Sequence, residues 1–152
     1  MGEPIRVLFV CVGNCVRSQM AEAIARHAHG DIIAPESAGV TPVGFIDKTA
    51  RAVLQEKGIS THGQFSKGLQ SEELKTPHLI INMSGIPGGS LFGQIFAGKK
   101  FEDWDVQDPF GEDIELHRRI RDNIETRVTL LAAQLRTSVR DDSVEPGRGS
   151  QR

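Results

Sequence analysis

The chain has 152 residues, of which 38% are hydrophobic and 25% are charged, and its formal net charge is −2. This length and composition are typical of one globular domain. The near-neutral charge gives no electrostatic argument for nucleic acid or an anionic membrane, and no apolar run approaches the roughly 20 residues that span a bilayer. The two cysteines cannot form a disulfide framework, which favours a cytoplasmic protein.

Strands and helices are predicted to alternate along the first half of the chain. Residues 4–10 form a continuous apolar run, typical of a buried strand, and residues 17–29 predict a helix. Residues 32–38 predict a second strand that Pro35 interrupts, and proline places this strand at a sheet edge because it cannot donate to a ladder. Residues 47–57 predict a second helix, and residues 71–74 predict a single helical turn after it.

The second half continues the alternation. Residues 78–83 predict a third strand, residues 84–90 a flexible loop and residues 100–106 a weaker fourth strand. In residues 112–136, apolar side chains recur at spacings of three and four, which predicts the clearest helix. Residues 138–152 are too polar to order themselves by burial, so we expect a disordered tail after a single domain of residues 1–137.

This alternation predicts a doubly wound α/β domain, which binds ligands beyond the carboxyl ends of its parallel strands. Cys11 lies at that end of the first predicted strand. A loop that runs from a strand into a helix directs backbone N–H groups and the positive end of the helix dipole toward an anion. Gly13 and Asn14 tolerate the positive φ that such a loop requires. Arg17 can grip an oxyanion with two parallel hydrogen bonds, and Ser18 can stabilise a leaving thiolate.

The segment CVGNCVRS, residues 11–18, resembles the Cys-x5-Arg-Ser loop of the low-molecular-weight protein tyrosine phosphatases and of the arsenate reductases that share their fold. Three further stretches are similar to this family: ESAGV at 36–40, QFSKGL at 64–69 and DWDVQDPFG at 103–111. RSQMAEA and QFSKGL are closest to the arsenate-reductase branch. The resemblance implies an α/β fold with three layers, a doubly wound sheet of four parallel strands in the order 2-1-3-4 and flanking helices.

The resemblance also implies the site. Cys11 would be the nucleophile, Arg17 the oxyanion ligand and Asp108, before Pro109, the general acid and base. Phosphate would be held by the loop residues Val12, Gly13, Asn14, Cys15, Val16, Arg17 and Ser18. Phe45 and Phe110 are equally consistent with pocket walls and with simple packing. No metal and no cofactor is expected.

Some residues have competing interpretations. In the phosphatase family a second cysteine commonly lies just before the arginine and protects the nucleophile, but that position here is Val16. We therefore favour Cys15 as a loop filler over a redox partner. His117 lies on the apolar stripe of the last helix, which favours a core histidine. Asp105 is a rival to Asp108 as the acid, but a solvated carboxylate is the simpler interpretation.

Three functions remain open from the sequence. A phosphomonoesterase acting on a phosphorylated protein, phosphotyrosine above all, or on a small aryl phosphate needs only Cys11, Arg17 and Asp108, and we favour it. An arsenate reductase would need an external thiol or redoxin partner, because residues 82–93 hold no cysteine for an internal relay. The third is an oxyanion-binding regulator without catalysis. We expect no nucleic-acid or membrane partner.

Overall fold

The computed structural model of the protein describes residues 2–144. Its centre is a four-stranded parallel sheet in the order β2-β1-β3-β4. The strands are β1 (Ile5–Cys11), β2 (Ile33–Gly39), β3 (Leu79–Asn82) and β4 (Lys100–Asp103). The predicted strand order is therefore confirmed, and so is the position of the proline-containing β2 at a sheet edge.

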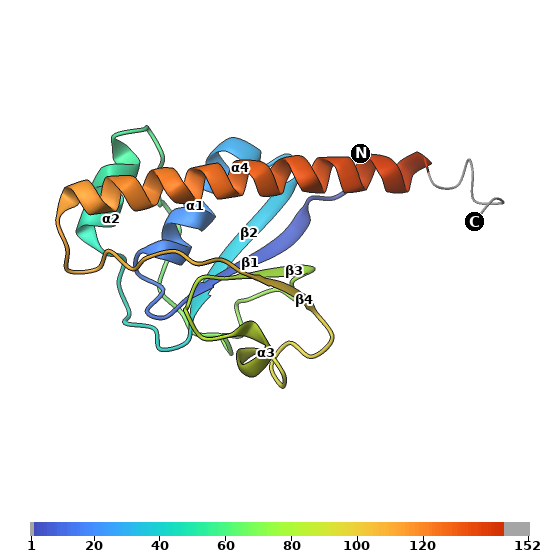
Figure 1. Cartoon of the computed structure of the whole chain (residues 1–152), viewed down its shortest axis with the longest axis horizontal. Helices are drawn as coiled ribbons and strands as arrows, with labels where there is room; N and C mark the ends of the chain where they lie inside the picture. Colours follow the sequence, from blue (N-terminus) through green and yellow to red (C-terminus); the bar gives the residue numbers. More distant parts are fainter. Residues whose placement is uncertain (1, 145–152) are drawn as a thin grey trace.

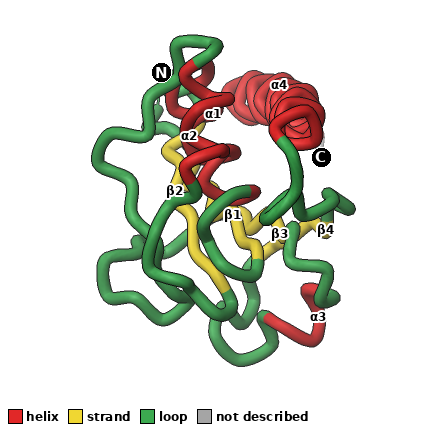
Figure 2. The backbone as a smooth tube through the Cα atoms, turned by 90° about the vertical axis from the view of Figure 1, so that its left-hand side faces the viewer, coloured by secondary structure: helices red, strands yellow, loops and turns green. Residues whose placement is uncertain are grey.

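Three helices lie on one side of the sheet, as Figures 1 and 2 show: α1 (Arg17–His29), α2 (Lys48–Gln55) and α4 (Ile114–Val144). The short α3 (Gly88–Leu91) lies on the opposite side, together with loops. The result is three layers with the sheet in the middle. No helix in residues 2–144 is long and apolar enough to cross a membrane.

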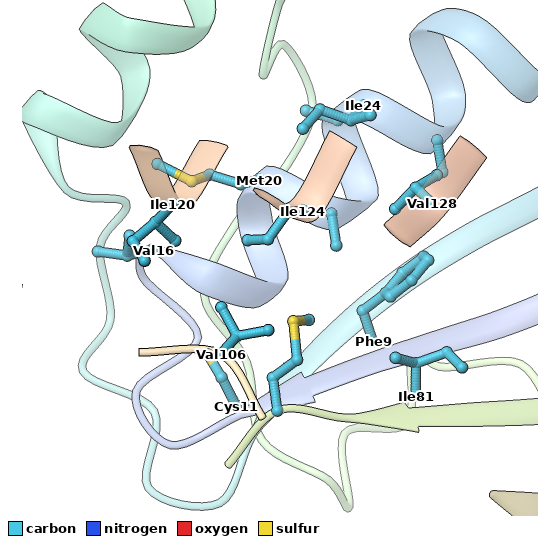
Figure 3. Packing of buried hydrophobic residues seen from close by; sticks show 14 of the residues in the cluster. Phe9, Cys11, Val16, Met20, Ile24, Ile81, Val106, Ile120, Ile124 and Val128 are labelled. Carbon is cyan, nitrogen blue, oxygen red and sulfur yellow. The ribbon is translucent and has the colours of Figure 1, made fainter. Parts of the chain in front are cut away.

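The core on the helical side of the sheet joins β1 to α1 and α4. In Figure 3, Phe9 lies below Ile24 of α1 and Ile124 of α4, and all three side chains are buried. Leu8 packs in a second cluster with Ile80. Because both faces of β1 are buried, its sequence is apolar at nearly every position rather than alternating.

Several predicted boundaries need correction. β2 runs without a break through Pro35 to Gly39, because a parallel edge strand pairs on one side only and needs no donor on its outer side. Residues 71–74 form a turn rather than a helix, and α3 begins inside the predicted loop at residues 84–90. β4 ends at Asp103, before the predicted residue 106.

The predicted disorder from residue 138 onward is wrong as far as residue 144, because α4 continues to Val144. Each residue added to an existing helix gains one hydrogen bond, and residues 137–144 contain neither glycine nor proline to stop it. The remaining predicted tail, residues 145–152, lies outside the described residues. That the single domain ends at residue 137 stays a prediction.

Candidate active site

The loop at residues 11–18 joins the sheet to α1. Cys11 is the last residue of β1 and Arg17 is the first residue of α1, as predicted. Figure 3 shows Cys11 at the tip of β1, beside Val106 at the margin of the core. Within residues 2–144, none of the backbone N–H groups of residues 12–18 donates to a protein acceptor, and Val16 provides no side-chain cap for α1. The loop is thus a run of free donors at a helix N-terminus, which is suited to an anion.

Asn14 fixes the shape of this loop. Its φ of 51° lies in the left-handed region, and its side chain is fully buried. Its Oδ1 accepts hydrogen bonds from the backbone N–H of Lys67 at 2.8 Å and from Gln19 Nε2 at 3.0 Å. Its Nδ2 donates to the hydroxyl of Ser18 at 2.8 Å. The side chain therefore offsets the strain of the left-handed backbone with buried hydrogen bonds.

Cys11 and Ser18 are in direct contact inside this loop. The Sγ and Oγ atoms lie 2.9 Å apart, and both residues are buried. A serine hydroxyl at this distance can donate its hydrogen to a thiolate, which stabilises the negative sulfur. This contact matches the predicted role of Ser18.

Arg17 is held by the segments that follow β3 and β4. Its Nη1 donates to the backbone oxygen of Met83 at 2.6 Å and to that of Val106 at 3.2 Å. Its Nε is buried and has no hydrogen-bond partner among the described residues. An unpaired buried donor costs about 1–3 kcal/mol, so such a group calls for an explanation. A bound oxyanion would satisfy it.

Asp108 lies beside this guanidinium. Its Oδ2 is 3.5 Å from Arg17 Nη2, its Oδ1 accepts from the backbone N–H of Phe110 at 3.1 Å, and its side chain is 50% exposed. The structure therefore brings Asp108 to the site that sequence reasoning predicted. Asp105 is also exposed, and its backbone oxygen accepts from Arg127 on α4.

Comparison with known proteins assigns the chain to a family. The sequence matches the family of low molecular weight phosphotyrosine protein phosphatases over residues 6–141. The chain belongs to this family.

Its relatives include both phosphatases and arsenate reductases. The glutaredoxin arsenate reductase of Synechocystis is 33% identical over 130 residues, covering 86% of this chain and 98% of the relative. The protein-arginine-phosphatase of Geobacillus stearothermophilus is 34% identical over 148 residues, covering 88% of this chain and 98% of the relative. The structure of a low molecular weight protein tyrosine phosphatase from T. tengcongensis is 31% identical with a TM-score of 0.74, covering 86% of this chain and 99% of that one.

Phe45 and Phe110 form an exposed aromatic pair. Their ring centroids lie 6.5 Å apart with the planes tilted by 47°, and the residues are 51% and 48% exposed. The rings thus pack on each other and also present apolar faces to solvent. Because the backbone of Phe110 contacts Asp108, this pair lies next to the predicted acid of the phosphatase family.

Cys15 differs from Cys11 in its surroundings. Both cysteines are free and buried. Burial, followed by the negative charge of the Cys11 sulfur, raises the pKa of the Cys15 thiol to about 11. Cys15 therefore stays protonated near neutral pH, which fits the predicted loop filler rather than a second nucleophile.

Sequence reasoning missed the residues that support the loop from behind. A Cβ atom at Gly39 would lie 2.6 Å from the backbone oxygen of Val12, so only glycine fits at the end of β2. Gln64 Nε2 donates to Gln19 Oε1 at 2.7 Å, and Ser66 Oγ donates to the backbone oxygen of Gly13 at 3.2 Å. The family-like stretches ESAGV and QFSKGL carried this signal, because they contain Gly39, Gln64 and Ser66.

A cavity of about 610 Å³ lies elsewhere, between the outer side of β2, α1 and residues 63–75. None of the predicted site residues lines it. A large cavity is often the first choice for a ligand site, but a tetrahedral oxyanion needs only a shallow cradle of donors. We therefore locate the chemistry at the loop. In residues 2–144 no group of three or more His, Cys, Asp or Glu side chains is placed to hold a metal ion.

His117 is buried, at 1% exposure, and its Nδ1 lies 2.8 Å from the backbone oxygen of Asp113. The prediction of a core position for His117 is confirmed, but its second ring nitrogen is not satisfied: Nε2 is buried, lies 3.4 Å from Asp47 Oδ2 and has no hydrogen-bond partner among the described residues.

Proposed function

We propose that the protein is a phosphomonoesterase that works through a phosphocysteine on Cys11. The observation that carries this proposal is the buried, unpaired Nε of Arg17 at a loop whose backbone N–H groups are also free. Buried donors without acceptors are rare in folded proteins, and a bound phosphate supplies acceptors to all of them. Membership of a family that contains phosphatases supports the same conclusion.

In the first step, the Cys11 thiolate attacks phosphorus, the S–P bond forms and the bond to the leaving oxygen breaks. Arg17 and the loop N–H groups bind the equatorial oxygens and stabilise the charge that spreads over them. Asp108 gives its proton to the leaving oxygen, so the product leaves as a neutral alcohol or phenol. Ser18 donates a hydrogen bond to the sulfur.

In the second step, Asp108 takes a proton from water, which attacks the phosphorus of the phosphocysteine. The S–P bond breaks, inorganic phosphate leaves, and Cys11 returns as a thiolate that Ser18 stabilises. No step requires a metal or a cofactor.

The exposed pair of Phe45 and Phe110 suits a flat leaving group, and we propose an aryl phosphate, phosphotyrosine of a protein above all. A phosphorylated guanidinium is also flat and can stack on an aromatic face. The Geobacillus relative is a protein-arginine-phosphatase, which makes phosphoarginine the natural comparison substrate. We propose a cytoplasmic location, because a thiol nucleophile works only where it stays reduced.

The test is hydrolysis of p-nitrophenyl phosphate, phosphotyrosine and phosphoarginine by one preparation, with Cys11→Ser as the inactive control. We expect turnover of the aryl substrates by the wild type and none by the variant. No wild-type turnover of any substrate across pH 5–8 would refute the proposal. Tight phosphate binding without turnover would instead support a non-catalytic regulator.

Arsenate reduction is the second candidate, favoured by the relative named a glutaredoxin arsenate reductase. Arsenate is tetrahedral and would occupy the same loop. Cys15 is the only cysteine besides Cys11, too few for an internal relay, so an external thiol would have to attack the sulfur of the arseno-cysteine. An S–S bond forms, the S–As bond breaks and its electron pair stays on arsenic, which leaves as arsenite. A second external thiol then reduces the mixed disulfide and regenerates Cys11. The test is arsenate-dependent NADPH consumption with glutathione, glutaredoxin and glutathione reductase. Absence of consumption both with this system and with mycothiol and mycoredoxin would exclude this reaction.

A further inference from the structure

His117 is a buried histidine whose two ring nitrogens both lie near oxygen atoms. Nδ1 is 2.8 Å from the backbone oxygen of Asp113, one turn earlier in the chain. Nε2 is 3.4 Å from Oδ2 of Asp47, the residue that caps the N-terminus of α2, and it has no hydrogen-bond partner among the described residues. No step of the proposed phosphatase reaction uses this ring, and an unpaired buried nitrogen calls for an explanation.

The two oxygens determine which charge state suits the ring. A backbone oxygen and an ionised carboxylate accept hydrogen bonds and never donate them. A neutral imidazole has only one ring hydrogen, so it would direct a lone pair toward one of the two oxygens inside a buried site. An imidazolium has a hydrogen on each nitrogen, and its positive charge is attracted to the carboxylate of Asp47. The surroundings of His117 therefore suit a cation paired with Asp47.

Other charges around the pair act in both directions. The positive ends of the helix dipoles of α2 and α4 oppose a cation at this place, and the carboxylate of Asp47 offsets them. The charged or titratable groups around the pair are Asp47 and Arg51 of α2, Asp113 and Arg121 at the start of α4, Arg17 of α1, and Cys15 and Asp108 of the neighbouring loops. Within residues 2–144, only Asp47 brings a charged oxygen within ion-pair distance of the ring.

The pair joins the two segments that carry the exposed aromatic rings. Asp47 follows Phe45 by two residues, and its backbone N–H donates to the backbone oxygen of Cys15 in the anion loop at 3.0 Å. His117 follows Phe110 by seven residues and lies in the first turn of α4. The contact between Asp47 and His117 thus ties the segment of Phe110 to the segment of Phe45, and the two ring centroids lie 6.5 Å apart.

We propose that His117 is a positioning residue: as an imidazolium paired with Asp47, it holds Phe45 and Phe110 at the spacing that accepts an aryl group beside the anion loop. Loss of the ring proton removes the attraction and directs a lone pair toward the carboxylate, so the aryl site loosens as the pH rises. Imidazole changes its charge close to neutral pH, which makes aryl binding sensitive to pH in this range. This inference rests on the proposed function, because it concerns the aryl site of the phosphatase.

The measurement is the binding of two ligands by calorimetry between pH 6 and pH 9. Benzylphosphonate occupies the anion loop and the aryl site, whereas inorganic phosphate occupies the loop alone. The two anions ionise over a similar pH range, so the ratio of their Kd values isolates the aryl contribution. His117→Phe keeps an aromatic ring in the core but cannot pair with Asp47. We expect it to reduce the advantage of benzylphosphonate over phosphate by about 10-fold at pH 6, the size of an aromatic contact.

The loss in His117→Phe should fade toward pH 9, because the wild-type ring has then also lost its proton. Asp47→Ser retains a good N-cap for α2 and removes the carboxylate, so it should cause the same loss. The double variant should match either single variant, because both changes remove one contact.

Two control variants make the same substitutions elsewhere. His27→Phe changes an exposed histidine of α1. Asp113→Ser changes an aspartate whose Oδ1 accepts from the backbone N–H of Leu116, which is the bond that Asp47 Oδ2 makes with Ala50. Both controls should keep the wild-type ratio.

An unchanged ratio in His117→Phe would overturn the proposal. A loss that is as large at pH 9 as at pH 6 would also overturn it, because packing and not charge would then be the cause. The same holds if the Kd of inorganic phosphate rises as much as that of benzylphosphonate, because the effect would then lie at the loop. If His117→Phe does not fold, Asp47→Ser decides by the same comparisons.

Nitrogen-15 NMR of the histidine rings gives a second readout. At pH 7 both ring nitrogens of His117 should carry a hydrogen in the wild type, whereas in Asp47→Ser only Nδ1 should carry one. A neutral His117 ring in the wild type at this pH would overturn the proposal. Neither calorimetry nor NMR needs turnover, so failure of the phosphatase assay and failure of this inference are seen separately.

Discussion

Gly39 and Val12 meet so closely that a side chain at residue 39 has no room: its Cβ atom would lie 2.6 Å from the backbone oxygen of Val12 and 2.9 Å from the backbone nitrogen of Asn14. The end of β2 is therefore the surface on which the anion loop rests. We expect Gly39→Ala to push the loop away and to lower kcat/KM by about 10²-fold, because small displacements of a catalytic group are costly.

The control for this prediction is Gly89→Ala, since nothing lies within 4 Å of a Cβ atom at that position. It should retain wild-type activity. Steady-state kinetics and circular dichroism of both variants make the comparison, and full activity in Gly39→Ala would show that the loop adapts to the added methyl group.

Arg17→Lys separates charge from geometry. Lysine keeps the positive charge but loses the planar fork that bonds Met83, Val106 and Asp108. We expect kcat to fall by about 10²–10³-fold, the usual cost of removing a donor that stabilises transition-state charge. The inhibition constant of inorganic phosphate should rise in parallel. An unchanged kcat would mean that Arg17 has only a structural role.

Asp108→Asn tests the general acid and base. We expect kcat to fall by about 10²–10⁴-fold with phosphotyrosine, while phosphate still binds because the loop is intact. The loss should be smaller with p-nitrophenyl phosphate, whose leaving group needs less protonation. Asp105→Asn, at the rival carboxylate, is the matched control. If it caused the larger loss, the acid would have to be reassigned.

Cys15 should be inert where Cys11 is reactive. Since burial raises the pKa of Cys15 to about 11, its thiolate is scarce at pH 7, and iodoacetamide should label Cys11 alone. Labelling of Cys15 should appear only as the pH approaches 11, and Cys15→Ser should remain active. Peptide mass spectrometry resolves the two sites, and equal labelling at pH 7 would contradict this prediction.

Glu56 should make stability depend on pH. Hydrogen bonds from Arg118 and Arg121 of α4 lower its pKa to about 2. A lowered pKa stabilises the fold above the unfolded-state value, which is 4.5, and this stability disappears as the pH falls toward 2. Glu56→Gln should therefore lower the urea midpoint at pH 7, with a difference from wild type that shrinks between pH 4.5 and 2.

The control for Glu56 is Glu72→Gln, an exposed glutamate in a turn, which should leave the urea midpoint unchanged at both pH values. A Glu56→Gln deficit that is as large at pH 2 as at pH 7 would show that the effect comes from packing and not from charge.

The sequence predicted the parts of the site that lie close together in the chain. Cys11 to Ser18 is a single local turn, so glycine, asparagine and arginine at set spacings indicated its chemistry before any fold was known. The positions of the strands and helices followed from apolar runs and periodicity, which depend on burial alone, whereas the strand order was implied by the resemblance to a family. Asp108 was found only because the resemblance to a family linked it to the distant loop.

Long-range support could not be predicted in the same way. Nothing local distinguishes Glu22 from a solvated helix residue, yet Ser37 and Arg26 bind it in a buried site. The backbone oxygens of Met83 and Val106 carry no residue-type signal at all, because every residue has one. The extension of α4 past residue 137 was missed because the polar composition of this segment shows only that it buries little apolar surface. A helix that has already formed can continue without such burial, because each added residue gains a hydrogen bond.

The two carbonyl contacts of Arg17 also have a meaning for folding. They join Arg17 to Met83, 66 positions later and just beyond β3, and to Val106, 89 positions later and beyond β4. When only β1 and α1 have emerged from the ribosome, the growing polypeptide therefore contains the Cys11 thiol, but the two carbonyl groups that orient the Arg17 guanidinium have not yet been synthesised. The enzyme should become active only when its last strand is added, so that catalytic competence marks the completion of the sheet.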